Sequence, residues 1–150
     1  MPKFATQDWC KEYCAAINGN EAYAEAASDW EGDFVFVIHP DGPLDKELKM
    51  WIGLYHGECT GASMVEEGEY KILEKGEEPS GGSPPPYEAE YLYEANYTDW
   101  VKILKKELDP IRALLSGKAK VKGDMAKIMR ATKAAQELVR STTLIETEFY

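Results

Sequence analysis

The chain has 150 residues, of which 44% are hydrophobic and 29% are charged. This length suits one domain with a single core, and the composition is that of a soluble globular protein. No apolar run approaches the roughly 20 residues of a membrane-spanning helix, and no secretory signal begins the chain, so we expect one cytoplasmic domain over 1–150.

The charge is distributed unevenly along the chain. The formal net charge is −10. Residues 1–100 carry six Lys or Arg against twenty-one Asp or Glu, which gives −15, and residues 101–150 carry eleven against six, which gives +5. The overall acidity argues against nucleic-acid binding. A local basic surface can still attract a phosphate group or an anionic lipid surface.

Two helices are predicted before residue 32. Residues 7–18 place apolar side chains at helical spacing, between an N-cap at Thr6 and a stop at Asn18-Gly19. Asn20 can cap a second, shorter helix within 21–30. Each helix would have an apolar face available for a core.

Three strands are predicted next. Residues 33–39, DFVFVIH, are almost continuously apolar and rich in aromatic and β-branched side chains, which indicates a strand covered on both faces. The turn sequence PDGP at 40–43 ends this strand. Residues 47–57 and 58–65 are predicted to form the second and third strands.

The middle of the chain changes in composition. Residues 66–86 are rich in Glu, Gly, Ser and Pro, and we expect a mobile loop with at most a short strand at 70–73. Residues 87–97 then alternate tyrosine or alanine with mostly glutamate, which predicts one half-exposed strand. Because the face opposite the tyrosines is acidic, they are expected to line a core or cavity rather than to stack on nucleic acid.

Two helices are predicted after this strand. Thr98 can cap a helix over 99–108. Asp109-Pro110 supply the cap and the first residue of a short helix that Gly117 would end.

The last part of the chain holds one more strand and one more helix. Residues 118–122 alternate as a strand, and an apolar stripe predicts a single helix over 124–141. The tail 142–150 is expected to be a last strand or a strap over the core. This order of elements predicts an α+β domain with a mainly antiparallel sheet.

No catalytic constellation is apparent in the sequence. The three cysteines are expected to be reduced thiols used in packing, with a metal or redox role as the less favoured alternative. His56 and Cys59 lie three residues apart, but nothing supplies an orienting third group. We therefore expect no catalytic residue, no metal and no cofactor.

The segment 108–130, LDPIRALLSGKAKVKGDMAKIMR, together with Trp100, resembles the sterol carrier protein type 2 family. The stretches WEGDFVFVIHPDG and LYHGECTGASMV and the final TEFY are also similar to its small stand-alone members. The likeness covers most of the chain from about Trp30 onward.

The resemblance implies an α+β fold in which a five-stranded, largely antiparallel sheet is covered by helices that enclose an apolar tunnel. It also implies non-catalytic binding, with or without transfer, of a fatty acid, fatty acyl-CoA, sterol-like lipid or phospholipid. Apolar side chains at the following positions are the predicted ligand contacts: Trp51, Trp100, Ile103, Leu104, Ile111, Leu114, Leu115, Met125, Ile128 and Met129. Core packing alone is the simpler alternative for any one of them.

Other interpretations stay open at this point. The same fold can serve as an interaction or oligomerisation module with a filled cavity, accessory to another protein, and an enzyme that uses Cys59 and His56 is a third hypothesis. The basic residues between 115 and 130 are expected mainly to be a solvated face. They are also a candidate for transient contact with a membrane surface: Lys118, Lys120, Lys122, Lys127 and Arg130. The sequence leaves open the identity of the ligand and whether the protein is a homodimer.

Overall fold

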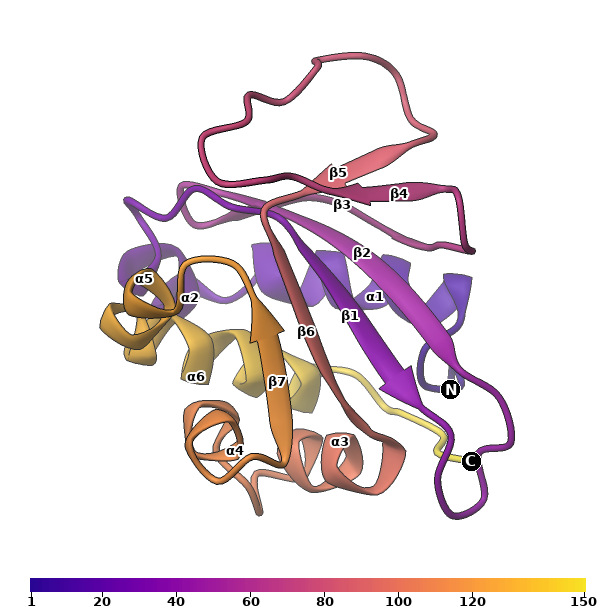
Figure 1. The fold of residues 1–150 in the computed structure, drawn as a ribbon. Coiled ribbons are helices and arrows are strands. Elements are labelled where there is room, and N and C mark those ends of the chain that lie inside the picture. The colour runs from indigo at the N-terminus through magenta and orange to yellow at the C-terminus, as the bar shows by residue number, and fades with distance from the viewer.

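The structure is a computed structural model that describes residues 1–150. Its centre is a five-stranded sheet with the strand order β3-β2-β1-β6-β7, and the helices lie against one face of it (Figure 1). A small two-stranded sheet, β4-β5, packs against the opposite face. In the main sheet only the β1–β6 pair is parallel, so the prediction of an α+β fold with a mainly antiparallel five-stranded sheet is confirmed.

The strands have the following bounds: β1 Phe34–His39, β2 Leu48–Tyr55, β3 Glu58–Met64, β4 Tyr70–Ile72, β5 Tyr87–Ala89, β6 Tyr91–Asn96 and β7 Ala119–Lys122. The helices are α1 Gln7–Asn18, α2 Glu21–Ala26, α3 Tyr97–Leu104, α4 Pro110–Leu115, α5 Met125–Arg130 and α6 Thr132–Arg140, followed by a short 3-10 helix at Ser141–Leu144. None of the helices is both long enough and apolar enough to cross a membrane.

Strand β1 is covered on both faces, as its apolar sequence predicts. Phe34 and Phe36 belong to the main core between the sheet and the helices. Val35 and Val37 pack on the other face with Ala89, beneath the β4-β5 sheet. The small second sheet therefore shields the face of the main sheet that the helices leave open.

The predicted strand 87–97 is two strands in two different sheets, so the prediction of one continuous strand is wrong. The chain changes sheet at Glu90, whose carboxylate accepts a hydrogen bond of 2.7 Å from the backbone N–H of Asp33. As a result, Ala89 and Tyr91 lie on opposite faces of the main sheet instead of sharing one face.

The N-caps of four helices follow the predictions, and the Thr6 hydroxyl accepts the backbone N–H of Trp9 at the start of α1. Asn20, Asp109 and Asp124 each accept hydrogen bonds from backbone N–H groups in the first turns of α2, α4 and α5. Thr98, by contrast, lies inside α3, and its hydroxyl bonds the carboxylate of Asp41.

Three predicted helices are shorter than expected. Helix α2 ends at Ala26, and α3 ends at Leu104, just before Lys106 adopts a positive φ of 63°. The single helix predicted over 124–141 is interrupted at Ala131, where φ is −103° and ψ is 31°. This break separates α5 from α6 and leaves α5 with a single buried residue, Ile128.

The carboxyl-terminal tail is a strap rather than a sixth strand of the main sheet. It forms one parallel bridge between Lys3 and Glu148, and the backbone N–H of Phe4 donates to the Glu148 carbonyl at 2.8 Å. The two ends of the chain therefore lie side by side (Figure 1).

Candidate functional site

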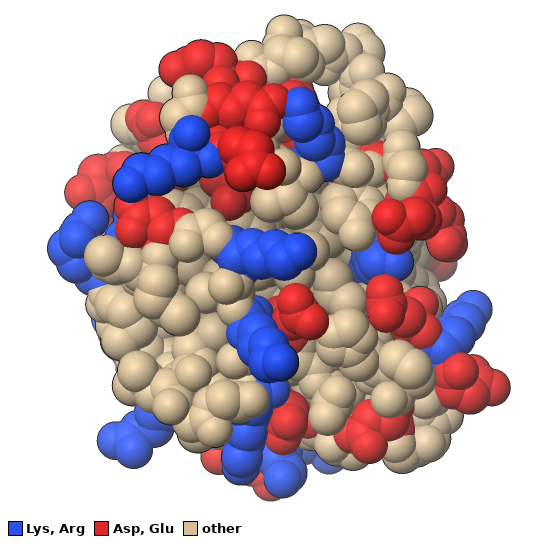
Figure 2. Space-filling view, viewed as in Figure 1, with Lys and Arg blue, Asp and Glu red and all other residues tan.

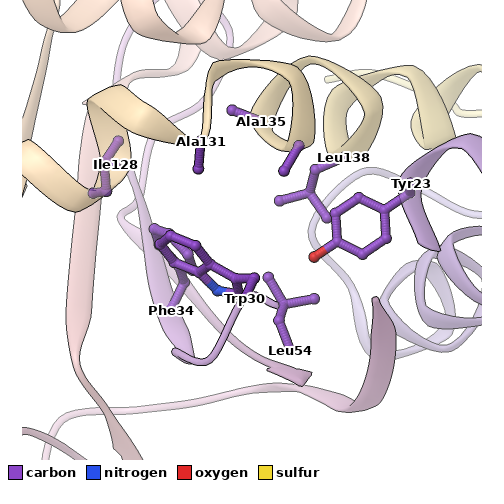
Figure 3. Close-up of a pocket in the computed structure, with 9 residues that line it drawn as sticks. Tyr23, Trp30, Phe34, Leu54, Ile128, Ala131, Ala135 and Leu138 are labelled. Atoms are coloured by element: carbon purple, nitrogen blue, oxygen red, sulfur yellow. The ribbon is translucent and has the colours of Figure 1, made fainter. Parts of the chain in front are cut away.

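Two adjoining apolar pockets lie between the helices and the main sheet. The first, called here the α6 pocket, has a volume of about 50 Å³ (Figure 3). All nine of its lining side chains are hydrophobic: Tyr23, Trp30, Phe34, Leu54, Ile128, Ala131, Ala134, Ala135 and Leu138. In the figure, α5 and α6 form one wall, and side chains from α2, β1 and β2 form the other.

The second, the central pocket, has a volume of about 80 Å³ and is lined by seventeen residues, none of them charged. These come from the amino-terminal segment, the sheet and the later helices: Phe4, Trp9, Tyr13, Phe34, Phe36, Met50, Tyr93, Trp100, Ile103, Leu104, Pro110, Ile111, Ile128, Ala135, Leu138, Val139 and Thr142. The two pockets share Phe34, Ile128, Ala135 and Leu138. They are therefore neighbouring parts of one apolar cavity.

The polar atoms of Trp30, Trp100 and Tyr93 in the aromatic walls are bonded to backbone carbonyls. The indole N–H of Trp30 donates to the carbonyl of Gly32 at 2.9 Å, and that of Trp100 donates to the carbonyl of Val37 at 3.0 Å. The hydroxyl of Tyr93 donates to a carbonyl at the start of α4 at 2.8 Å. These bonds satisfy the polar groups and leave hydrocarbon surface facing the cavity.

A buried polar network fixes the distance between α2 and α6. The Asn20 carboxamide oxygen accepts from the backbone N–H of Tyr23 at 3.2 Å and from the Arg140 guanidinium at 2.8 Å. Its nitrogen donates to the Glu137 carbonyl at 3.2 Å and to the Ser141 hydroxyl at 3.0 Å. Both helices contribute walls to the α6 pocket, so this part of the cavity is held firmly in place.

The structure brings half of the ten predicted contacts to the cavity. Five line the central pocket: Trp100, Ile103, Leu104, Ile111 and Ile128. Leu114 is buried and Met129 is half-buried against the core, but neither lines a pocket.

Three of the predicted contacts lie elsewhere, and their placement in the cavity is wrong. Leu115, at the end of α4, is 71% exposed, and Met125, the first residue of α5, is 42% exposed. Trp51 lies on the opposite face of the main sheet, where its ring packs against Tyr87 with ring centroids 4.7 Å apart and its N–H donates to the Glu88 carbonyl. Leu115 and Met125 match the apolar spacing of their segments but fall at helix ends, where the chain turns away from the core.

Tyr93 lines the central pocket, as the tyrosine alternation predicts, but sequence reasoning missed the walls supplied by α1, α2, β1 and β2. Phe34, Phe36 and Met50 face the cavity from β1 and β2. The continuous apolar run of β1 signals burial but does not distinguish one face from the other. The helical spacing places Tyr23 on an apolar helix face, which is correct, but nothing in its sequence context indicates a pocket.

The cavity is narrow as it stands. Its pockets, of about 50 and 80 Å³, are well below the roughly 300–1,000 Å³ of typical small-molecule sites. A long-chain ligand therefore needs its walls to move apart.

The cysteines and histidines form no reactive arrangement. Burial raises the pKa of the Cys10 thiol to about 12, and burial is also the main cause that raises the pKa of Cys59 well above its ordinary value. Cys59 is thus a neutral thiol that donates to the Gly61 carbonyl, and only a thiolate is strongly nucleophilic. The His56 ring pairs with Glu31 at 2.7 Å on the surface. No three metal-binding side chains come together in the structure.

Basic side chains form a row on the surface along β7 (Figure 2). Lys118, Lys120 and Lys122 are all exposed, and so is Arg130. Lys127 is half-buried, because its ammonium group lies over an aromatic ring of the cavity wall. Lys118, Lys120 and Lys122, which we call the lysine row, belong to the β7 segment, whereas Lys127 of α5 lies against the cavity wall.

Comparison with known proteins gives a consistent result. The sequence model of the SCP-2 sterol transfer family matches residues 44–136. A solution structure of a conserved protein from Thermus thermophilus, described as a candidate sterol carrier protein, is 31% identical with a TM-score of 0.77, covering 97% of this chain and 92% of its own. A crystal structure of sterol carrier protein 2 is 30% identical with a TM-score of 0.74, covering 96% and 100%.

A more distant structure, apo sterol carrier protein 2 from Yarrowia lipolytica, shares the fold at 12% identity and a TM-score of 0.52, covering 90% of this chain and 87% of its own. No curated protein sequence matches the chain. The family match extends over more than half of the chain and runs from β2 into the first half of α6, so it includes several of the elements that wall the cavity. The chain therefore belongs to the SCP-2 sterol transfer family, a family of lipid-binding, non-catalytic proteins.

Proposed function

We propose that this protein binds one long-chain apolar lipid, without a cofactor and without chemistry, in the cavity between the main sheet and the helices. The observation that carries the proposal is the cavity itself, which is lined by hydrophobic side chains and contains no charged residue. The proposed contacts from the predicted set are those that line the central pocket: Trp100, Ile103, Leu104, Ile111 and Ile128.

The energetics of burial favour a long hydrocarbon chain. Removing each methylene group from water contributes about 0.8 kcal/mol, so a chain of about fifteen such groups gains on the order of 12 kcal/mol. Binding costs about 4 kcal/mol or more in lost freedom. The remainder, about 8 kcal/mol, corresponds to micromolar affinity.

Helix α5 is the proposed moving wall. It is six residues long, has one buried residue and is separated from α6 by the non-helical Ala131, whereas α6 is tied to α2 through Asn20. Besides the buried Ile128, a basic side chain fastens α5 to the body: the Lys127 ammonium lies 4.6 Å from the Trp30 ring centroid and donates to the Glu31 carbonyl. We call this set of contacts the Lys127 latch. Its release would widen the α6 pocket.

We further propose that the lysine row contacts the surface of an anionic bilayer while the lipid is exchanged. Lys118, Lys120 and Lys122 are exposed in sequence along one edge of the sheet. Leu115 and Met125, both exposed, flank them in the chain. Basic and apolar side chains together favour the charged interface of a membrane.

The chain is proposed to form one domain over 1–150. Helices α1 and α6, from opposite ends of the sequence, both contribute walls to the central pocket through Tyr13 and Leu138. Removal of either end would therefore open the cavity to solvent.

A second candidate function is favoured by the small pocket volumes. With about 50 and 80 Å³ of free space, the cavity can be an ordinary core, and the protein would then act as an interaction module, in a homodimer or with another protein. This candidate predicts no lipid binding and a stable complex in solution, which light scattering of the purified protein would detect.

Titration with diphenylhexatriene, a hydrocarbon that fluoresces in apolar surroundings, separates the two functions. We expect saturable binding and displacement by long-chain lipids. Ile128→Asp places a carboxylate in both pockets and should abolish binding, since a buried unpaired charge is strongly unfavourable. Leu115→Asp, a matched change at a side chain that is 71% exposed, should leave binding intact. Circular dichroism checks that both variants are folded. A wild-type protein that binds no probe would refute the proposal.

A further inference from the structure

One polar atom faces the otherwise apolar α6 pocket. Tyr23 is 2% exposed, and Figure 3 shows its hydroxyl directed into the space between Trp30, Leu54 and Leu138. Every fully buried side-chain nitrogen or oxygen in the protein has a hydrogen-bond partner. The Tyr23 hydroxyl has none among the protein groups, which sets it apart from the other buried tyrosines of the cavity.

The comparison with those tyrosines is direct. Tyr13 donates to the Leu138 carbonyl at 3.0 Å, and Tyr93 donates to the Pro110 carbonyl at 2.8 Å. Buried hydroxyl groups are normally bonded, because an unpaired one loses its interactions with water and gains none. The Tyr23 side chain is 2% exposed as a whole, and its hydroxyl has no protein partner and reaches the pocket space, so it is arranged for a partner that enters the pocket.

A trapped water molecule is a poor partner at this position. A buried water needs two to four polar groups around it. The α6 pocket offers only the Tyr23 hydroxyl, because every other lining side chain is hydrocarbon or has its polar atom bonded elsewhere. A ligand whose polar group is attached to an apolar body fits the pocket better.

The surroundings also restrict the charge of that polar group. No Lys, Arg or His lines either pocket, so a carboxylate would enter without a counter-ion. Tyr13 and Cys59 are titratable groups close to Tyr23, and both are neutral because burial raises their pKa values. The Tyr23 phenol stays protonated for the same reason and can both donate and accept a hydrogen bond.

We infer that Tyr23 is a specificity-determining residue that hydrogen-bonds the uncharged hydroxyl or carbonyl end of a neutral lipid and selects it over a free carboxylate. The inference rests on the proposed lipid-binding function and deepens it. The polar end lies in the α6 pocket, and the hydrocarbon body continues past Phe34 and Ala135 into the central pocket.

The test uses Tyr23→Phe, which removes only the hydroxyl, with hexadecanol and palmitate as competitors for diphenylhexatriene. Loss of one neutral hydrogen bond should weaken hexadecanol binding about 3- to 10-fold. Palmitate and diphenylhexatriene affinities should stay within about two-fold of wild type, because neither presents an uncharged polar end to the pocket. Tyr97→Phe is the matched control, because Tyr97 is equally buried, lines neither pocket and bonds the backbone of Tyr150; it should lower the melting temperature without changing the preference between the two competitors.

The outcomes are distinguishable. An unchanged hexadecanol affinity in Tyr23→Phe, or an equal loss for all three molecules, would overturn the role of Tyr23 while leaving lipid binding in place. A wild-type protein that binds none of the three would overturn the proposed function and this inference with it. A selective loss for hexadecanol, in a variant with a wild-type circular dichroism spectrum, supports the assignment.

Discussion

The substitution Ala135→Leu fills part of the cavity without destabilising the fold, and it therefore tests directly whether the ligand lies there. Ala135 lies on α6 and lines both pockets. Leucine is nearly as good a helix former as alanine, and it would project three more carbon atoms into the free space. These atoms would displace about three methylene groups of a bound chain.

The expected loss of affinity follows from that displacement. At about 0.8 kcal/mol per methylene group, the variant should lose about 2 kcal/mol of binding free energy, roughly a 30-fold rise in Kd. The same burial offsets the cost of added volume in the free protein, which is typically about 1–3 kcal/mol, so the free energy of unfolding should change little.

Diphenylhexatriene titration measures the Kd, and urea denaturation measures the free energy of unfolding. Ala126→Leu, at an exposed position of α5, is the control and should leave the Kd unchanged. An Ala135→Leu variant of wild-type stability that binds the probe as tightly as wild type would refute the placement of the ligand.

Three further predictions concern the surroundings of the cavity. Burial is the main cause that raises the Asp33 pKa from 3.8 to about 6. The protonated Asp33 carboxyl therefore contributes to the free energy of unfolding in full below pH 3.8, and this contribution is lost as the pH rises through about 6. Asp33→Asn should therefore melt at a higher temperature than wild type above about pH 6.5, and the gain should disappear below about pH 4; a gain independent of pH would contradict this. Lys127→Ala removes the Lys127 latch, so stopped-flow fluorescence should record faster entry and release of the probe with little change in Kd; unchanged rates would exclude α5 as the moving wall. Replacing Lys118, Lys120 and Lys122 with glutamine should weaken binding to phosphatidylserine vesicles by roughly 100-fold at low salt, at about 1 kcal/mol per lysine, and wild-type binding by the triple variant would remove the membrane proposal.

Local chemistry predicts much of this fold. The caps at Asn20, Asp109 and Asp124 and the doubly covered strand β1 all follow from short sequence patterns. Each depends on groups within a few residues of one another, so no knowledge of the tertiary structure is needed.

The sequence does not reveal two breaks in its regular elements. Alternation continues through Glu90, and the apolar stripe continues through Ala131, although the chain changes sheet at the first and leaves the helix at the second. At the first break, Glu90 bonds a distant partner, the backbone N–H of Asp33. The periodicity of apolar residues within one segment carries no information about partners that are distant in the sequence.

The candidate site was predicted less completely than the fold. Predicted residues of the later helices, such as Trp100 and Ile128, do line the cavity, because the apolar face of a helix packs toward a single core. The prediction for Trp51 was wrong because a strand that is covered on both faces has apolar side chains in two different cores, and the sequence does not say which core a given side chain joins. The role proposed for the Tyr23 hydroxyl requires the pocket between α2 and α6, and only the packed structure reveals that pocket.

Native mass spectrometry of the freshly purified protein tests the central claim most directly. The account predicts a fraction of the protein carrying one adduct of lipid mass, which organic extraction identifies and which is missing from the Ile128→Asp variant. Only the mass of the unliganded chain, before and after incubation with hexadecanol and palmitate, would contradict the claim that this cavity holds a lipid.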